Sequence, residues 1–203
     1  MRSLPKTVVL SLLALSFGLQ ARGEQDIDKL ALGTYAGNVG FSVAGHPVLF
    51  VGKDGSASTF PQRYELYVSP TTNPTVSNWD PNGGYGFKLV WGSYSGNVHG
   101  YWITTPTPQY HGMRQRFFCW QPGGPGGTVQ FWNQDRKAQG QPEDNEMWYF
   151  EIADHDQHLV RIRNRYSRYV SLGANQTLVS GADQQHAQVF KVDFGVASFS
   201  NEW

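Results

Sequence analysis

Cysteine is almost absent from this sequence, and its scarcity narrows the class of protein. Cys119 is the single cysteine of the chain, so no intramolecular disulfide can form. Secreted eukaryotic domains of this size often carry several disulfides. An exported chain without a disulfide is more typical of a bacterial protein. Cys119 lies between Phe118 and Trp120, and in these apolar surroundings we expect a buried side chain rather than a nucleophile.

An excess of one charge is also missing. The chain contains 16 lysine and arginine residues and 16 aspartate and glutamate residues. Such a balance gives no general attraction to nucleic acid or to an anionic membrane surface. No apolar run approaches the ~20 residues that a membrane-spanning helix needs. The sequence therefore predicts neither a nucleic-acid partner nor a membrane span.

The N-terminus carries the longest apolar run. Arg2 and Lys6 precede the apolar segment Val8–Phe17, and small and polar residues lead from there to Ala21. A positive start, a short apolar segment and a small residue at the cleavage point are the three parts of a secretory signal peptide. We therefore predict a signal peptide over residues 1–21 and a secreted or periplasmic mature protein.

The rest of the chain has the composition of an all-β protein. Residues 22–203 suit one domain, and cleavage after Gly18 is the alternative start. The chain has 23 glycines, and 14% of its residues are aromatic; aromatic residues fit pleated strands, and glycine supplies turns. No window shows the apolar spacing of an amphipathic helix. Alternating or apolar segments predict twelve short strands: Gly40–Ala44, Val48–Val51, Arg63–Val68, Tyr85–Trp91, Gly100–Thr104, Arg114–Trp120, Thr128–Asn133, Trp148–Ala153, Leu159–Arg163, Tyr169–Leu172, Thr177–Ser180 and Val189–Phe194.

A weak internal repeat favours one kind of all-β fold. Three segments read alike, Tyr85–Trp91, Trp148–Ile152 and Phe190–Phe194, at unequal spacings that loop insertions can absorb. Three units of four short strands would fill the domain, and that arrangement is a single β-trefoil. The alternative is a two-sheet β-sandwich. The tryptophans that alternate with apolar strand residues are predicted to lie in the core: Trp91, Trp120 and Trp148.

Part of the chain resembles one repeat of the ricin-B-type lectins. Thr128–Gln134 reads TVQFWNQ, and Asn145–Phe150 reads NEMWYF; the lectin repeats have a strand similar to VQLW, a loop and then an NQxW element. Residues 159–194 also resemble repeats of the fascin-like and amaranthin-like agglutinins of the β-trefoil group. The resemblance covers the C-terminal half of the chain and implies a β-trefoil that binds sugar.

The lectin resemblance also implies a ligand-binding site. Trp132 matches the aromatic side chain that stacks on a sugar ring, and Gln130 and Asn145 match its polar neighbours. A pyranose has an apolar face that packs on an indole, and its hydroxyls need fixed hydrogen-bond partners. Asn133 is a further hydrogen-bonding candidate, and Trp79, which lies in a polar segment, is a second stacking candidate.

One expected residue is missing from this site. The lectins carry an aspartate on the strand before the tryptophan, and the corresponding segment here, Arg116–Cys119, contains no acidic residue. In the last repeat, Ser171 is near the corresponding position. The sequence therefore supports the fold more strongly than the sugar site, because repeats can keep a fold without its function.

A basic cluster offers an alternative site. In the segment VRIRNR, Arg161 and Arg163 alternate with apolar residues and should share one face of a strand. Arg165 and Arg168 follow closely. Guanidinium groups match the oxygens of sulfate, phosphate and carboxylate, so this cluster predicts an anion site for a sulfated glycan, a phosphate or an acidic partner. The plainer interpretation is a solvated face that binds nothing.

No pattern in the sequence indicates catalysis. The segment Asp154–His158 (DHDQH) could hold a metal through imidazole and carboxylate groups, but a polar hairpin turn is the favoured interpretation. The chain has no GxSxG, HExxH or P-loop motif. We predict no enzyme, no metal and no cofactor.

Together these features predict a non-catalytic, lectin-like carbohydrate-binding module that is exported from the cell. The alternative is a protein–protein interaction, inhibitor or toxin-accessory module on the same β-trefoil scaffold. The expected partner is accordingly a glycan or another protein.

Overall fold

The protein is all-β, as its composition predicts. The computed structural model describes residues 25–52, 63–72, 83–94, 98–104, 116–120, 127–133 and 146–196. The predicted signal peptide lies outside these residues. Every predicted strand has a counterpart, and β4 is an addition. The strands are β1 (Gly37–Val43), β2 (His46–Gly52), β3 (Arg63–Val68), β4 (Gly83–Gly84), β5 (Phe87–Tyr94), β6 (Val98–Thr104), β7 (Arg116–Trp120), β8 (Gly127–Asn133), β9 (Trp148–Asp154), β10 (Leu159–Asn164), β11 (Tyr169–Leu172), β12 (Leu178–Ala182) and β13 (Val189–Phe194).

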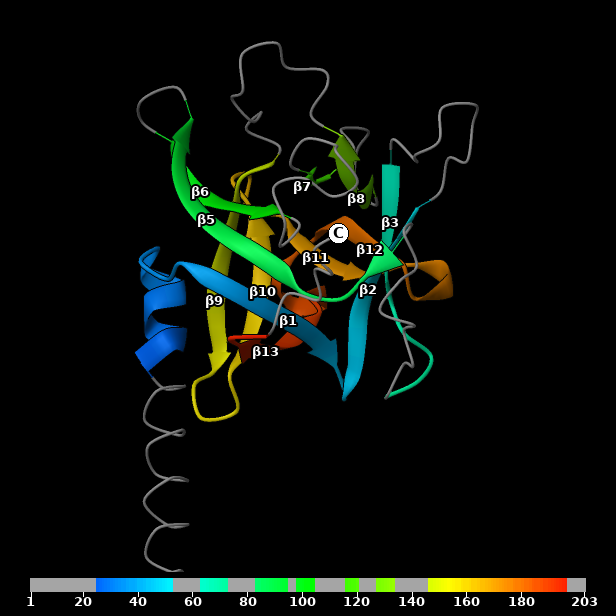
Figure 1. Cartoon of the computed structure of the whole chain (residues 1–203), viewed down its shortest axis with the longest axis horizontal. Helices are drawn as coiled ribbons and strands as arrows, with labels where there is room; N and C mark the ends of the chain where they lie inside the picture. Colours follow the sequence, from blue (N-terminus) through cyan, green and yellow to red (C-terminus); the bar gives the residue numbers. More distant parts are fainter. Residues whose placement is uncertain are drawn as a thin grey trace, which may run out of the picture.

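Six of the strands pair in a closed ring (Figure 1). Strand β1 pairs with β5, β5 with β6, β6 with β9, β9 with β10, β10 with β13, and β13 returns to β1. Every one of these pairings is antiparallel. Each ring strand therefore has a partner on both sides, and the apolar faces of the strands turn inward to one shared core.

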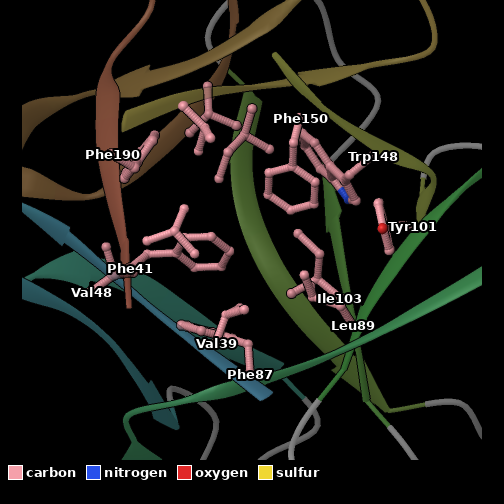
Figure 2. Packing of buried hydrophobic residues seen from close by; sticks show 14 of the residues in the cluster. Val39, Phe41, Val48, Phe87, Leu89, Tyr101, Ile103, Trp148, Phe150 and Phe190 are labelled. Carbon is pink, nitrogen blue, oxygen red and sulfur yellow. The ribbon is translucent and has the colours of Figure 1, made fainter. Parts of the chain in front are cut away.

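The register of the ring repeats three times along the chain. Within each of three successive units, the first ring strand pairs with the second at one buried position: Val39 with Phe87, Tyr101 with Trp148, and Val160 with Phe190. Neighbouring units pair at the next buried position: Phe41 with Val192, Leu89 with Ile103, and Phe150 with Ile162. All twelve side chains are at most 6% exposed, and Figure 2 shows most of them in the core. The three segments that read alike in the sequence therefore hold equivalent positions.

Of the seven remaining strands, β4 pairs with β2, and the other six form three hairpins that meet one another. The hairpins are β2–β3, β7–β8 and β11–β12. Strand β8 pairs with both β3 and β12, and a bridge joins Tyr67 to Thr177. The second strand of each hairpin contributes buried apolar side chains to the core: Leu66 and Val68 on β3, Val129 on β8 and Leu178 on β12. The hairpins thus repeat in the same order as the ring strands.

A short helix over residues 25–32 precedes β1, and the sequence analysis did not predict it. Its buried side chains, Ile27 and Leu30, are three residues apart, and Gly33 ends it with a φ of 77°, a conformation that glycine adopts without strain. The Tyr101 hydroxyl accepts a hydrogen bond from the Tyr35 amide at 3.0 Å and donates to the Lys29 carbonyl at 3.3 Å. Two apolar residues are too few to show a helical period, so packing rather than pattern places this helix.

The core prediction is confirmed for one tryptophan and wrong for another. Trp148 is fully buried, whereas Trp91 is 40% exposed. Strand β5 pairs with β1 only at residues 87–89, so Trp91 extends beyond the ring and lies beside Tyr101 at a centroid distance of 4.9 Å. The side chain of Trp120, the third predicted core tryptophan, lies outside the described part of the structure.

Replacement of Phe41 tests the shared core. Its ring centroid lies 5.3 Å from Phe87, 5.9 Å from Phe150 and 6.4 Å from Phe190. We expect Phe41→Ala to lower the free energy of unfolding by about 3–5 kcal/mol, because it removes a buried ring and leaves a cavity. Tyr166→Ala, at a position that is 52% exposed, should change it by about 0.5 kcal/mol or less. Equal losses in denaturant unfolding of the two variants would contradict this core.

Candidate functional site

The outward face of β10 carries two arginines, as the alternating sequence predicts. Val160 and Ile162 point into the core and are at most 1% exposed, whereas Arg161 and Arg163 between them are only partly buried. Because successive side chains of a strand point to opposite faces, the two guanidinium groups share the outer face. The ring thus fixes the position of both arginines.

Two tyrosines flank Arg163 across the neighbouring strands. The register places Tyr149 of β9 and Tyr169 of β11 opposite Arg163 on either side. The guanidinium carbon of Arg163 lies 4.6 Å from the centroid of the Tyr149 ring, within the range of a cation–π interaction. This stacking restrains the guanidinium. Its Nη1 donates to the Asn164 carbonyl at 3.4 Å, and the remaining N–H groups can bind a ligand in the plane of the group.

A carboxylate with fixed orientation lies beside the arginines. Glu151 of β9 is directly opposite Arg161 in the register. The Tyr169 hydroxyl donates to Glu151 Oε2 at 2.7 Å, and Gln184 Nε2 donates to Glu151 Oε1 at 2.5 Å. A carboxylate has about four acceptor positions, so each oxygen can still accept a hydrogen bond from a ligand hydroxyl.

The pKa of Tyr169 reflects its burial, its contact with Glu151 and its closeness to the two arginines. Burial, followed by the hydrogen bond to Glu151 and the negative charge of that carboxylate, raises the pKa of Tyr169. The positive charges of Arg163 and Arg161 act in the opposite direction. The hydroxyl therefore stays protonated and acts as a hydrogen-bond donor at neutral pH.

The arginines are available to bind an anion. Among the described residues, Arg161, Arg163 and Arg168 form no ion pair with a carboxylate. Arg161 Nε is buried and has no hydrogen-bond partner within the described part of the chain. A buried donor without a partner is costly. An oxyanion that reached Arg161 would accept a hydrogen bond from this Nε–H group, which the described residues do not.

The turn after β10 extends the basic surface and is held by a buried asparagine. Asn164 is 1% exposed, and its Oδ1 accepts hydrogen bonds from the amides of Tyr166 at 2.9 Å and Arg168 at 3.0 Å. The guanidinium carbon of Arg165 lies 4.8 Å from the centroid of the exposed Tyr166 ring. The turn therefore presents Arg165 and Arg168 from a defined backbone.

The lectin-like candidates fall mainly outside what the structure describes. Gln130, Trp132 and Asn133 lie on β8, but only their backbone is described; Gln130 pairs with Glu65, and Trp132 pairs with Arg63. The other candidates, Asn145 and Trp79, are outside the described residues. The convergence of Gln130, Trp132 and Asn145 therefore remains a prediction.

The predicted turn at Asp154–His158 is confirmed. Residues 155–158 form a turn between β9 and β10, and the Gln157 amide donates to Asp154 Oδ1 at 3.0 Å. His155 Nε2 lies 3.2 Å from Asp28 Oδ1 on the preceding helix. Across the described ranges, no group of three or more histidine, cysteine, aspartate or glutamate residues could hold a metal ion.

The sequence predicts the arginines but not the residues that contact them. Tyr149 and Glu151 alternate on β9 with buried residues, and this period of two was a usable signal. Tyr169 and Gln184 reach the site from β11 and from the short 3-10 helix Gln184–His186. No spacing in the sequence predicts those two contacts, because they depend on how the β11–β12 hairpin packs against β9.

Comparisons with known proteins do not assign the chain to a family. No family model matches the sequence, and no curated protein matches it. Similar solved structures are a lysenin pore (15% identity, TM-score 0.42), a complex of lysenin with phosphocholine (13%, 0.45) and a Caenorhabditis elegans protein of unknown function (11%, 0.47). They cover 78%, 78% and 79% of this chain, which spans 46%, 44% and 95% of theirs.

The chain thus spans less than half the length of either lysenin chain. None of these three structures is described as a ricin-B-type lectin, so that resemblance stays a prediction. In the part of the chain that the structure describes, no helix is long and apolar enough to cross a membrane.

Replacement of Tyr169 by phenylalanine tests the assembly of the site. Tyr169→Phe removes the donor to Glu151 and should lower the free energy of unfolding at pH 7 by about 1 kcal/mol. Because the pKa of Tyr169 is raised in the folded protein, its contribution is complete below pH 10 and is lost as pH rises through that raised pKa. The wild-type advantage over the variant, measured by denaturant unfolding from pH 7 to pH 11.5, should be constant and then shrink. A difference of zero at pH 7 would contradict the assembly.

Proposed function

We propose that the all-β domain is a single β-trefoil. The closed ring of six strands, the three hairpins and the register that repeats three times support this fold over a two-sheet sandwich. The repeat is also visible in the sequence at Phe87, Trp148 and Phe190. In such a scaffold the three units can diverge on their outer faces while their inward residues stay apolar.

We propose that the protein is an exported, non-catalytic carbohydrate-binding module and that its ligand is an acidic glycan. The observation that carries the proposal is the outer face of β9–β11, where Arg161 and Arg163 lie beside the oriented carboxylate of Glu151 without an ion pair to it. A sugar acid or sulfated sugar carries both an anionic group and hydroxyl groups. The arginine forks suit the first, and Glu151 suits the second.

The preformed geometry supports binding rather than turnover. Tyr149, Tyr169 and Gln184 restrain the arginine and the carboxylate before a ligand arrives, which lowers the entropic cost of binding. Glycoside cleavage needs two carboxyl groups across the scissile bond, and among the described residues Glu151 is the one carboxylate that joins this cluster. The geometry therefore favours recognition of an intact sugar.

A glycan array compares this site with the lectin-like site on β8. We expect the mature protein to bind sulfated or carboxylated glycans, and Arg163→Ala to weaken that binding about ten-fold or more because a charge-assisted hydrogen bond is lost. Trp132→Ala and the control Lys29→Ala, which removes a cation from the helix over residues 25–32, should bind normally. Binding of neutral sugars that Trp132→Ala abolishes and Arg163→Ala keeps would overturn the assignment in favour of the β8 site.

Export is tested separately by the mass of the mature chain. If the signal peptide is removed after Ala21, the protein recovered outside the cytoplasm begins at Arg22. Intact-mass spectrometry of the protein from the periplasm or the medium measures this directly. Recovery of the full-length chain from the cytoplasm alone would contradict export.

A further inference from the structure

We propose that the ligand is a chain with several anionic groups, and that it runs along β10 from Arg161 to the turn at residues 165–168. This inference rests on the proposed function, and it names the class of ligand: a linear polyanionic glycan rather than a single acidic sugar. Its support comes from the arrangement of four arginines, from the order of the turn and from the lack of arginine at the described equivalent positions of the other two junctions between units.

The four arginines lie on β10 and on the turn that follows it. Arg161 and Arg163 are two residues apart on one strand face, so their Cα atoms are separated by about 6.6 Å. Arg165 and Arg168 continue the series into the turn, where both are exposed. A ligand with one anionic group could occupy one end of this surface and leave the other unused.

The Glu151 carboxylate gives the surface a direction. Glu151 is opposite Arg161, at the end of the series farther from the turn. Its negative charge disfavours a second anionic group beyond Arg161. The anionic groups of a chain therefore extend from Arg163 toward the turn, and a hydroxyl-bearing end lies beside Glu151.

The turn is ordered enough to act as a binding surface. The buried Asn164 side chain accepts from two turn amides and its Nδ2 donates to Ser180 Oγ at 3.5 Å. The Asn164 amide also donates to the Arg168 carbonyl at 2.9 Å. Ser167 is held at a φ of 56°, a left-handed conformation that a serine adopts only when its surroundings impose it. Asn164 is therefore a positioning residue for Arg165 and Arg168.

At the described register positions, the other two junctions between units lack the arginine pair, so we expect one chain to bind one ligand segment. The repeating register identifies the positions equivalent to the pairs Tyr149–Arg163 and Glu151–Arg161. On β5–β6 and on β13–β1 these equivalent pairs are Lys88–Thr104, Val90–Trp102, Lys191–Ser42 and Asp193–Gly40. Neither set contains an arginine. The junction between the second and third units has thus diverged from the same scaffold toward an anionic ligand.

Calorimetry with a length series of one sulfated oligosaccharide tests the inference. For the mature wild-type protein we expect one site per chain and an affinity that rises about ten-fold or more from the shortest to the longest member, with a steeper loss at high salt for the longest. Arg165→Ala/Arg168→Ala should bind the shortest member like the wild type and lose most of the gain with length. Both replaced side chains are exposed, so the fold should be kept, and circular dichroism verifies this.

A control variant with the same change in charge separates the extended path from a general effect of charge. Lys29→Ala/Lys88→Ala also removes two positive charges, on the helix over residues 25–32 and on β5, and should keep the wild-type dependence on length. Equal length dependence in both double variants would overturn the extended path while leaving an acidic-sugar site in place. If no member of the series and no monosaccharide acid bound the wild type, the proposed function itself would fail.

Discussion

The pairing of β1 with β13 is the constraint on which the rest of the structure depends. These strands come from opposite ends of the described chain, and their register joins Phe41 to Val192 and Gly40 to Asp193. Strand β13 also pairs with β10, so the same contact that closes the ring fixes the strand that carries the arginines. An open ring would leave exposed edges and would free β10 on one side.

One property of strands then produces both the core and the candidate site. Alternation buries Val160 and Ile162 and turns Arg161 and Arg163 outward on the same short strand. The buried residues are under the threefold constraint of the shared core, whereas the outward positions are free to differ among the units. The binding surface that we propose is therefore a local divergence on a repeated frame, and it needs no change in the core.

Much of this could be predicted from the sequence, for reasons that particular residues make clear. Period-two alternation and glycine-bearing turns predicted the strands and the shared face of Arg161 and Arg163. The same reasoning failed at Trp91, because alternation cannot tell where a strand leaves the ring. It also could not bring Tyr169 and Gln184 to Glu151, since those contacts join β11 and a 3-10 helix to β9. Non-local contacts carry no periodic signal.

The most direct test is to map the bound ligand by backbone amide chemical shifts in solution. A sulfated oligosaccharide would be titrated into isotope-labelled mature protein while the amide spectrum is recorded. The account predicts that the largest shifts fall on Glu151, on residues 161–168 and on Gln184, and that β5, β6 and β8 are little changed. Shifts concentrated on β8 around Trp132, with β10 and its turn unchanged, would contradict it.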